Sequence, residues 1–325
     1  MLNLTNAAEK GSAILNRKLK QMLWTAGKQY AMHLLSEKFR NVRRERERKQ
    51  RRTRAAVAGC AVLGCAAAVP LMLLSPGRAG AEKRAPFLGR NFAHRGLHRP
   101  DRSVPENSLA AFRLAAEAGY GIELDVRLSA DGDVVVFHDD SLKRVCGVDR
   151  RVDELTGAEL RQLRLYGTEE TVPLFSQVLE TVGGRVPLIV ELKNGPRNRE
   201  LCRKTCALLR SYQGCVCIES FNPFVVGWFR FHAPEFVRGQ LAMPKAYYVR
   251  EGMRPFRSAL LAGTWLNAVG RPNFIAYSLG KRPLSVRVAE TLGAMRFGWT
   301  AHDPSAEKGR DAVIFEFYRP AIRFK

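Results

Sequence analysis

The stretch "GIELDVRL" (Gly121 to Leu128) places two acidic residues inside an apolar run. In a β-strand successive side chains point to opposite faces, so the apolar residues at positions 122, 124 and 126 share one face, while Glu123 and Asp125 share the other. Two like charges about 4 Å apart repel by roughly 4 kcal/mol at an effective dielectric constant near 20, and burial makes ionisation still harder. We therefore expect a positive charge to lie between the two carboxylates.

Apolar, β-rich runs recur along residues 91–325 and alternate with helical patterns. The runs cover residues 91–94, 121–128, 134–138, 187–193, 215–220, 237–242, 274–278, 295–300 and 311–315, and helical spacing fits residues 108–118, 155–165, 175–182, 199–212, 224–231 and 284–292. Such alternation is typical of a parallel α/β fold, and its length favours an eight-stranded (β/α)8 TIM barrel over an open doubly wound sheet. Since nine runs are present, we expect one of the last four to lie outside the ring.

The positive charge of the chain is concentrated at its N-terminal end. The formal net charge is +22, and residues 1–54 hold 15 Lys and Arg against 4 Asp and Glu. Apolar residues recur at helical spacing among these bases, namely Ile14, Leu15, Leu19, Met22, Leu23, Ala26 and Tyr30. We interpret residues 1–54 as a basic cytoplasmic tail, partly an amphipathic helix, that lies on anionic membrane lipids or packs on a partner or on itself. A basic run beside a membrane span is more economically explained by topology than by nucleic-acid binding.

An uncharged stretch, "AAVAGCAVLGCAAAVPLMLLS", follows at residues 55–75. As a helix rising ~1.5 Å per residue it would be about 31 Å long, close to the ~30 Å hydrocarbon core of a bilayer. A buried core helix and a cleaved signal peptide are alternatives, but a signal peptide has a shorter apolar region and a short leading region. We predict a single transmembrane helix over residues 55–75.

The flanks of this stretch and the cysteines complete the organisation. Eight Lys and Arg lie in residues 41–54 and four in residues 76–90. The positive-inside rule then predicts a single-pass protein of the cell membrane with a cytoplasmic N-terminus and an extracytoplasmic catalytic domain. Residues 76–90 form the predicted linker and residues 91–325 the predicted barrel. The seven cysteines include no paired CxxC motif, which argues against a structural zinc site.

Three acidic residues belong to two of the predicted strands. Glu123 and Asp125 lie on the run at residues 121–128, and Glu191 lies in "PLIVELK" at residues 187–193. In a barrel of this type, polar residues at the C-terminal ends of the strands point into the active-site mouth, so the three carboxylates face one point. An all-oxygen ligand set suits one hard divalent cation, Ca²⁺ or Mg²⁺.

Basic residues and histidines end the same set of strands. His94 and Arg95 follow one another in "FAHRG", His138 ends "VVVFH", and Lys193 comes two residues after Glu191. Lys193 and Arg95 cannot be metal ligands, so they indicate an anionic substrate, and phosphate fits best. The two histidines are candidates for acid and base catalysis.

An ordered set of motifs closely resembles the glycerophosphodiester phosphodiesterases. The motifs are "HRG" (94–96), "PENSLAAF" (105–112), "IELDVRLSADGDVVVFHDDSL" (122–142), "VPLFSQVLE" (172–180), "LIVELK" (188–193) and "ESFNP" (219–223). The resemblance implies a (β/α)8 barrel of the phospholipase C-like phosphodiesterase type. It also implies hydrolysis of glycerophosphodiesters to an alcohol and sn-glycerol 3-phosphate.

The resemblance carries roles over to matching positions of this chain. The implied roles are metal binding by Glu123, Asp125 and Glu191, acid and base catalysis by His94 and His138, and substrate binding by Arg95, Lys193 and Trp299. Trp299, in "FGWTAHD", would line the glycerol pocket. The chain departs from the family pattern there and in "IFEFYRP" (314–320), where the family usually ends in an acidic "TD" pair. We expect both departures to affect substrate preference, since we place them in the half that shapes the alcohol side.

Each candidate also has a structural reading. The acidic pair could form ion pairs with neighbours such as Arg127, Glu191 and Lys193 could pair with each other, and Trp299 could belong to the core. Glu106 and Asn107 resemble helix-capping residues that could also support the site residues, and His98 has no assigned role. Two rival functions also stay open. These are lysophospholipase D-like hydrolysis of a lipid, and an inactive barrel that acts as a membrane-tethered binding module. No protein partner is predictable.

Overall fold

The computed structural model describes residues 17–22, 24–25, 28, 32–33, 36–38, 40–41, 43–55 and 68–325. The chain divides into two compact units, Met1–Ala68 and Val69–Lys325. In the first unit every described residue between 17 and 55 is helical and exposed, and these include Leu19 and Met22 of the predicted amphipathic helix. The other five apolar positions of that pattern, and residues 56–67 of the predicted span, lie outside the described residues. Among the helices that are described, none is long and apolar enough to cross a membrane.

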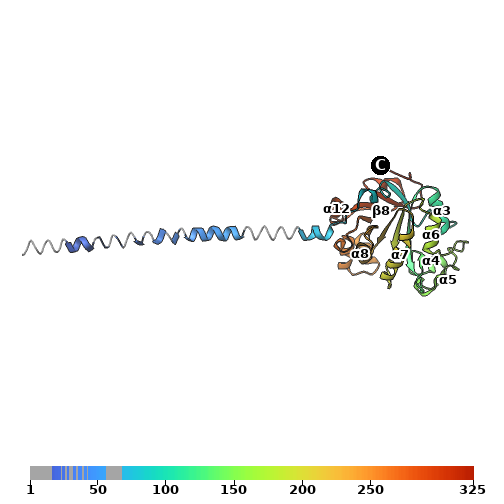
Figure 1. The fold of residues 1–325 in the computed structure, drawn as a ribbon, viewed down its shortest axis with the longest axis horizontal. Helices are drawn as coiled ribbons and strands as arrows, with labels where there is room; N and C mark the ends of the chain where they lie inside the picture. The colour runs from blue at the N-terminus through green and yellow to red at the C-terminus, as the bar shows by residue number, and fades with distance from the viewer. Residues whose placement is uncertain are drawn as a thin grey trace, which may run out of the picture. The chain divides into compact units, whose positions relative to one another are not determined.

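The second unit is a closed barrel of eight parallel strands (Figure 1). In ring order the strands are β1 (Arg90–Ala93), β2 (Gly121–Leu128), β4 (Leu188–Leu192), β5 (Val216–Ser220), β6 (Val237–Ala242), β7 (Phe274–Ser278), β8 (Met295–Ala301) and β9 (Ala312–Phe315). The ring closes because β1 pairs with both β2 and β9. The predicted (β/α)8 barrel is confirmed.

The ninth strand, β3 (Val134–Val136), lies outside the ring and runs antiparallel to β2. The prediction that the extra strand is one of the last four is therefore wrong. A short turn joins the two strands, with the Ser129 backbone N–H donating to the Asp133 carbonyl at 3.0 Å. Strands joined by so short a turn pair antiparallel, whereas a ring position would need a crossover of a dozen or more residues.

Helices cover the outer face of the barrel. They are α2 (Ala81–Arg84), α3 (Leu109–Glu117), α4 (Lys143–Cys146), α5 (Gly157–Leu160), α6 (Phe175–Val182), α7 (Asn198–Ser211), α8 (Pro223–His232), α9 (Lys245–Arg250), α10 (Pro255–Ala262), α11 (Asn267–Gly270) and α12 (Leu284–Thr291), with the 3₁₀ helices η1 (Val152–Glu154) and η2 (Pro304–Glu307). In α6, residues 175, 178, 179 and 182 are buried at the spacing of one helix face. Gly183, at a φ of 57°, ends the helix in the left-handed conformation that glycine adopts without strain.

The helix predicted over residues 155–165 is mostly absent, since only α5 forms there. Thr156 caps α5, but beyond it the Leu165 backbone N–H bonds to the Glu170 carbonyl at 2.8 Å, which bends the chain back on itself. The pattern was misleading because buried leucines of an irregular loop happen to recur at helical spacing. Three short helices between β6 and β7, α9 to α11, were not predicted at all.

The segment just before β1 packs against the barrel. Leu74 is buried together with Ile275 of β7 and Val286 of α12, and its carbonyl accepts a hydrogen bond from the Asn267 side chain at 3.2 Å. Phe87 is buried and its ring lies 6.3 Å from that of Phe92. The predicted linker over residues 76–90 thus contributes an apolar side chain to the barrel interior.

Candidate active site

The three predicted carboxylates meet at the C-terminal edge of the barrel. The parallel pairing of β2 and β4 sets Asp125 opposite Glu191, and Glu123 lies one pleat before Asp125 on the same face. One oxygen from each of the three carboxyl groups lies within 4.8 Å of the other two. All three side chains are buried. The chain thereby concentrates three acidic groups where water cannot solvate them.

The electrostatics of this cluster favour a cation. Burial raises the pKa of Glu123 well above its ordinary value, and the charges of Asp125 and Glu191 raise it further. Burial likewise raises the pKa of Glu191. For Asp125 burial also acts upward, but Lys193 and the other nearby positive groups outweigh it and hold its pKa well below the ordinary value. The buried oxygens therefore fit a hard divalent cation such as Ca²⁺ or Mg²⁺, which would favour the ionised form of all three groups.

Lys193 supplies part of the positive charge. Its Nζ lies 2.9 Å from Glu191 Oε1 and 3.4 Å from Asp125 Oδ1. Burial lowers the pKa of Lys193, but these two carboxylates outweigh burial and leave it raised. Lys193 thus supplies one positive charge beside Asp125, and the ion pair between Glu191 and Lys193 is formed.

The loop after β1 holds the other side of the cluster. The Arg95 backbone N–H donates to Glu123 Oε2 at 3.0 Å, and the Asn107 amide donates to Asp125 Oδ2 at 2.9 Å. The Arg95 guanidinium bonds to Glu106 at 2.7 Å and lies 3.5 Å from Asp125. Arg95 and Asn107 both have φ above +50°, a region that non-glycine residues seldom occupy and that clusters at functional sites.

Asn107 and Glu106 do not cap the following helix. Ser108 is the N-cap of α3, since its hydroxyl accepts from the Ala111 backbone N–H at 3.1 Å. This leaves Asn107 and Glu106 free to orient Asp125 and Arg95. The capping interpretation of these two residues is therefore wrong, whereas the contacts with Asp125 and Arg95 agree with the supporting role.

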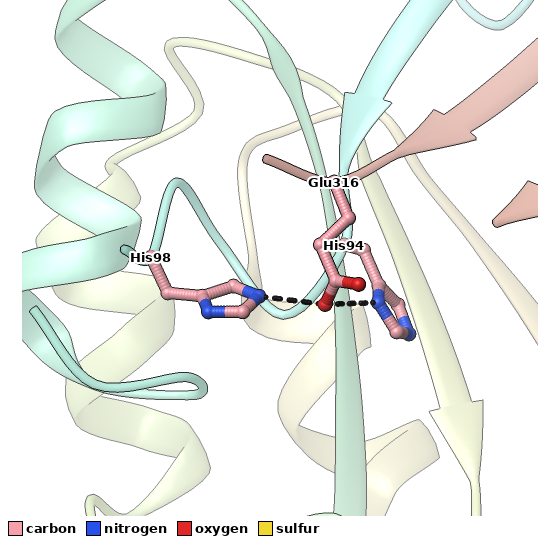
Figure 2. Close-up of side chains that lie close together, drawn as sticks. All are labelled: His94, His98 and Glu316. Carbon is pink, nitrogen blue, oxygen red and sulfur yellow. Dashed lines mark hydrogen bonds and ion pairs between the residues drawn. The ribbon is translucent and has the colours of Figure 1, made fainter. Parts of the chain in front are cut away.

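His94 is held by a carboxylate from the last strand (Figure 2). Its Nδ1 lies 3.1 Å from Glu316 Oε1, and His98 Nε2 lies 2.9 Å from the same oxygen. With Nδ1 engaged, Nε2 is turned toward the carboxylate cluster, 4.0 Å from Glu123. Burial lowers the pKa of His94, and the hydrogen bond to Glu316 acts in the opposite direction. The pair resembles the carboxylate–histidine arrangement that fixes the orientation of a catalytic imidazole.

His138 is held in the same manner by its neighbour in the chain. Its Nδ1 lies 2.6 Å from Asp139 Oδ1, and Arg144 binds the other oxygen of Asp139 at 2.6 Å. Arg144 also donates two hydrogen bonds to Glu106, at 2.8 and 2.9 Å. Since Glu106 in turn binds Arg95, one ion-pair network connects the support of His138 to the loop after β1.

Sequence reasoning missed the residues that support the histidines. Glu316 directly follows the last strand, β9, much as His94 follows β1, and this position is the signal that could have identified it. We instead placed "IFEFYRP" on the alcohol side, whereas Glu316 contacts His94 and His98. Asp139 was visible as the residue after His138. His98, to which we gave no role, shares the oxygen of Glu316.

A fourth acidic residue, Glu219, faces the cluster from β5. The strand register sets it opposite Glu191, and it is buried. Its Oε2 has no hydrogen-bond partner among the described residues. Burial and the three neighbouring carboxylates raise its pKa well above the ordinary value. The orphaned oxygen is a second indication that this region is built around a cation.

Trp299 belongs to an aromatic group on the opposite side of the mouth. Its ring meets that of Phe221 edge to face at 5.7 Å, and Phe221 meets Tyr248 at 6.3 Å. The Trp299 indole N–H donates to the Ala276 carbonyl at 3.0 Å, which fixes the ring. Trp299 is half-buried, whereas Tyr248 is buried. In ring order, Trp299 on β8 lies across the barrel from β4, which Lys193 follows.

Comparison with known sequences identifies the protein family. The model of the Glycerophosphoryl diester phosphodiesterase family matches residues 94–315, which is more than half of the chain. The chain belongs to this family. The predicted resemblance and the class of enzyme it implies, a phosphoric diester hydrolase, are thereby confirmed for the barrel.

Curated members of the family match part of the chain. A glycerophosphodiester phosphodiesterase of Caldanaerobacter subterraneus subsp. tengcongensis is 34% identical over 163 residues, which cover 46% of this chain and 65% of that protein. A lysophospholipase D of Rattus norvegicus is 31% identical over 156 residues, which cover 44% of this chain and 48% of that protein. The chain therefore matches less than two thirds of the length of either relative.

Solved structures of glycerophosphodiester phosphodiesterases share the fold. A phosphodiesterase of Oleispira antarctica, in complex with its product sn-glycerol-3-phosphate, superposes with a TM-score of 0.58 at 26% identity and covers 71% of this chain and 94% of that one. A glycerophosphodiester phosphodiesterase of Thermotoga maritima has a TM-score of 0.51 at 27% identity, over 69% of this chain and 93% of that one. The glycerophosphodiester phosphodiesterase barrel is thus present almost in full.

Proposed function

We propose that this protein hydrolyses glycerophosphodiesters to an alcohol and sn-glycerol 3-phosphate, with one divalent cation, Ca²⁺ or Mg²⁺, and with His94 and His138 as acid and base. The observation that carries the proposal is the buried cluster of Glu123, Asp125 and Glu191, whose oxygens lie within 4.8 Å of one another. The solved structure with sn-glycerol-3-phosphate as its product supports the choice of substrate.

Charge complementarity assigns the binding groups. When bound to Glu123, Asp125 and Glu191, a divalent cation would act as a Lewis acid toward a phosphoryl oxygen. Lys193 and Arg95 lie beside the same carboxylates and would offset the charge that builds on the phosphoryl oxygens in the transition state. With a cation bound, a phosphodiester monoanion would meet positive charge from the cation, Lys193 and Arg95.

The histidine geometry supports proton transfer at the Nε2 atoms. The Nδ1 atoms of His94 and His138 face Glu316 and Asp139, at 3.1 and 2.6 Å. This leaves each Nε2 available to the substrate. One histidine would take the proton from the nucleophile, and the other would give a proton to the leaving alcohol.

Hydrolysis of glycerophosphocholine by the purified full chain tests the proposal, with sn-glycerol 3-phosphate measured as the product. We expect hydrolysis to stop on addition of a chelator and to return with Ca²⁺ or Mg²⁺. Product formation that ignores the chelator would contradict the metal dependence. An inactive binding barrel, the rival from another class, would show no hydrolysis with any cation.

A binding measurement separates metal loading from catalysis. A cation at about 100 times its Kd stabilises the folded protein by about 2.7 kcal/mol, so its addition should raise Tm. The variant Glu191→Gln should lose this rise, because it removes one ligand from the cluster. Glu180→Gln, which changes an exposed glutamate of α6, is the matched control and should keep the full rise.

A lipid phosphodiester is the second candidate substrate, with lysophospholipase D-like chemistry at the same residues. It is favoured by the likeness to the lysophospholipase D of Rattus norvegicus and by the aromatic group of Phe221, Tyr248 and Trp299. Rates on glycerophosphocholine and on a lysophospholipid, measured with the same preparation, separate the two substrates.

We also propose a single-pass location in the cell membrane, with the N-terminus in the cytoplasm and the barrel outside, in contact with membrane lipids through the span and the basic tail. The support is the uncharged sequence at residues 55–75 and the excess of basic residues before it. Protease added to sealed cells should degrade the barrel and spare the tail. Degradation of neither part would contradict this topology.

A further inference from the structure

Three consecutive connections of the barrel present large apolar side chains to solvent. Phe224 follows β5, Phe256 follows β6 and Leu284 follows β7, and they are 68%, 74% and 73% exposed. Tyr247 and Val249 of α9 are exposed as well. All five residues lie in connections that leave the C-terminal ends of parallel strands, which is the end of the barrel that carries the candidate active site.

The same connections are strongly basic. Residues 221–300 contain 11 Lys and Arg but only 3 Asp and Glu. Two of the acidic residues, Glu235 and Glu290, already pair with arginines, which leaves Glu251 alone on this surface. The exposed basic residues around the apolar ones are Lys245, Arg250, Arg254 and Arg257. We call these four bases together with Phe224, Tyr247, Val249, Phe256 and Leu284 the apolar-basic rim.

Arg250 illustrates how the two kinds of side chain are combined. Its guanidinium lies 5.3 Å from the centre of the Tyr247 ring, and both side chains are exposed. Exposed aromatic residues surrounded by uncompensated arginines and lysines are typical of surfaces that enter the headgroup region of an anionic bilayer. A neutral or basic protein surface would leave these charges unmatched.

The helix that leads into the barrel contacts one of these connections. Residues 69–74 are helical, and the Leu74 carbonyl accepts a hydrogen bond from Asn267, in the same β6–β7 connection as Phe256. Val69, Leu71 and Met72 of that helix are exposed. Residues 69–74 belong to the stretch predicted to span the membrane (55–75), so the structure packs the end of that stretch, at Leu74, against the barrel instead.

We propose that the apolar-basic rim docks the barrel on an anionic phospholipid bilayer, with the mouth of the candidate active site at the lipid surface. Tyr248, on the buried face of α9, packs against Phe221, and Phe221 packs against Trp299. The surface that meets the lipid is thus continuous with the aromatic side of the mouth. The consequence for lipid substrates rests on the proposed function, whereas the docking rests on the rim alone.

A fluorescent reporter in the full chain tests the docking. The variant Phe256→Cys, labelled with an environment-sensitive dye and placed in vesicles of phosphatidylcholine with phosphatidylglycerol, should show a blue-shifted emission that nitroxide-labelled lipids quench. In vesicles of phosphatidylcholine alone both effects should weaken. The unsubstituted protein gives the background from native cysteines such as Cys215, which is exposed.

Phe231→Cys is the matched control. Phe231 is 69% exposed, almost as much as Phe256, but it lies at the C-terminal end of α8, toward the opposite end of the barrel. Its label should show neither shift nor quenching. Equal signals at both positions, or none at position 256, would overturn the proposal.

A second set of variants tests whether docking requires the positive charges of the rim. Arg254→Gln with Arg257→Gln in the labelled Phe256→Cys protein should lower the ratio of docked to free barrel on the order of tenfold. Arg113→Gln with Arg161→Gln, which changes two exposed arginines elsewhere on the barrel, should leave it unchanged. An equal loss in both pairs would contradict a specific rim. Hydrolysis of glycerophosphocholine in the same samples reports on the proposed function separately, because the fluorescence signals require no catalysis.

Discussion

The two sides of the barrel mouth differ in their balance of acidic and basic residues. Residues 121–200 contain 15 acidic residues (Asp and Glu) and 11 basic ones (Lys and Arg). Residues 221–300, a segment of equal length, contain only 3 acidic residues but again 11 basic ones. On the first side the charges are locked to one another, as Arg144 is to Asp139 and Glu106. On the second side aromatic rings line the mouth, and the bases outside it have few acidic partners.

This difference in composition matches the different roles that we propose for the two sides of the mouth. Groups that move protons or hold a cation must be fixed in position, and an ion-pair network in a buried region fixes them. Groups that recognise an alcohol or a lipid can be apolar, since contact area and shape suffice. We therefore expect substitutions on the charged side to affect turnover and those on the aromatic side to affect substrate choice.

Removal of either histidine that we propose as acid or base should give the largest effect. His94→Ala and His138→Ala should each lower kcat by about 10²–10⁴, since each removes one proton transfer. Initial rates on glycerophosphocholine measure the loss, and circular dichroism checks that the fold is kept. His232→Ala, on the outer helix α8, is the control and should turn over normally. Near-normal rates in either site variant, with metal still bound, would refute the assignment.

Glu316→Gln should give the next largest effect. Loss of a carboxylate that orients a functional histidine typically costs on the order of 10- to 100-fold in activity. Because the hydrogen bond to the Glu316 carboxylate raises the pKa of His94 against the lowering by burial, its removal should move the limb of the pH–rate profile that belongs to His94 to lower pH.

A purely structural role for Glu316 would predict otherwise. Instability would lower the amount of active enzyme at every pH without moving the limb. Glu316→Asp keeps the charge and should recover part of the activity, because a shorter carboxylate can still reach the imidazole through a small backbone adjustment. A pH profile that is unchanged in Glu316→Gln would remove Glu316 from the mechanism.

Trp299→Ala probes the aromatic side and should mainly raise KM. A lost apolar contact in a substrate pocket is worth about 10- to 200-fold in specificity, and we expect the lower end because Phe221 and Tyr248 remain. Steady-state kinetics on glycerophosphocholine and on a lysophospholipid should show unequal changes. Trp228→Ala, on α8, is the matched control. A large fall in kcat with KM unchanged would place Trp299 on the catalytic side.

The charged side was also the more predictable one. Its residues come in pairs close together in sequence, such as Glu123 with Asp125 and Glu191 with Lys193, and the two-residue period of a strand puts each pair on one face. The nine β-rich runs also coincided with the nine strands. Periodicity reports which side chains share a face but not which strands are neighbours, so β3 could not be separated from the ring strands.

Contacts between distant residues were the part that could not be predicted. His94 and Glu316 meet across 222 positions of sequence, and only ring closure between β1 and β9 brings them together. The helices α9 and α10 were missed because their exposed apolar residues break the amphipathic pattern that identifies a surface helix. The same exposure that hid these helices defines the apolar-basic rim.

The ion-pair network of the charged side should leave a smaller signature in the pH dependence of stability. Burial acts to raise the pKa of Glu106, but Arg144 and Arg95 outweigh it and lower the pKa from 4.5 to about 2. Between these values the unfolded chain binds a proton that the folded protein does not, so stability rises with pH. The contribution of Glu106 is therefore complete above about pH 4.5 and is lost as pH falls toward 2.

Glu106→Gln should remove this part of the acid sensitivity. Unfolding by urea, followed at several pH values between 2 and 6, should show a shallower fall in free energy of unfolding for the variant than for the parent protein. Glu180→Gln, which changes an exposed carboxylate of α6, should keep the slope of the parent. Equal slopes in all three proteins would mean that Arg144 and Arg95 do not hold Glu106 in its ionised form. The charged side of the mouth would then owe its rigidity to packing rather than to this network.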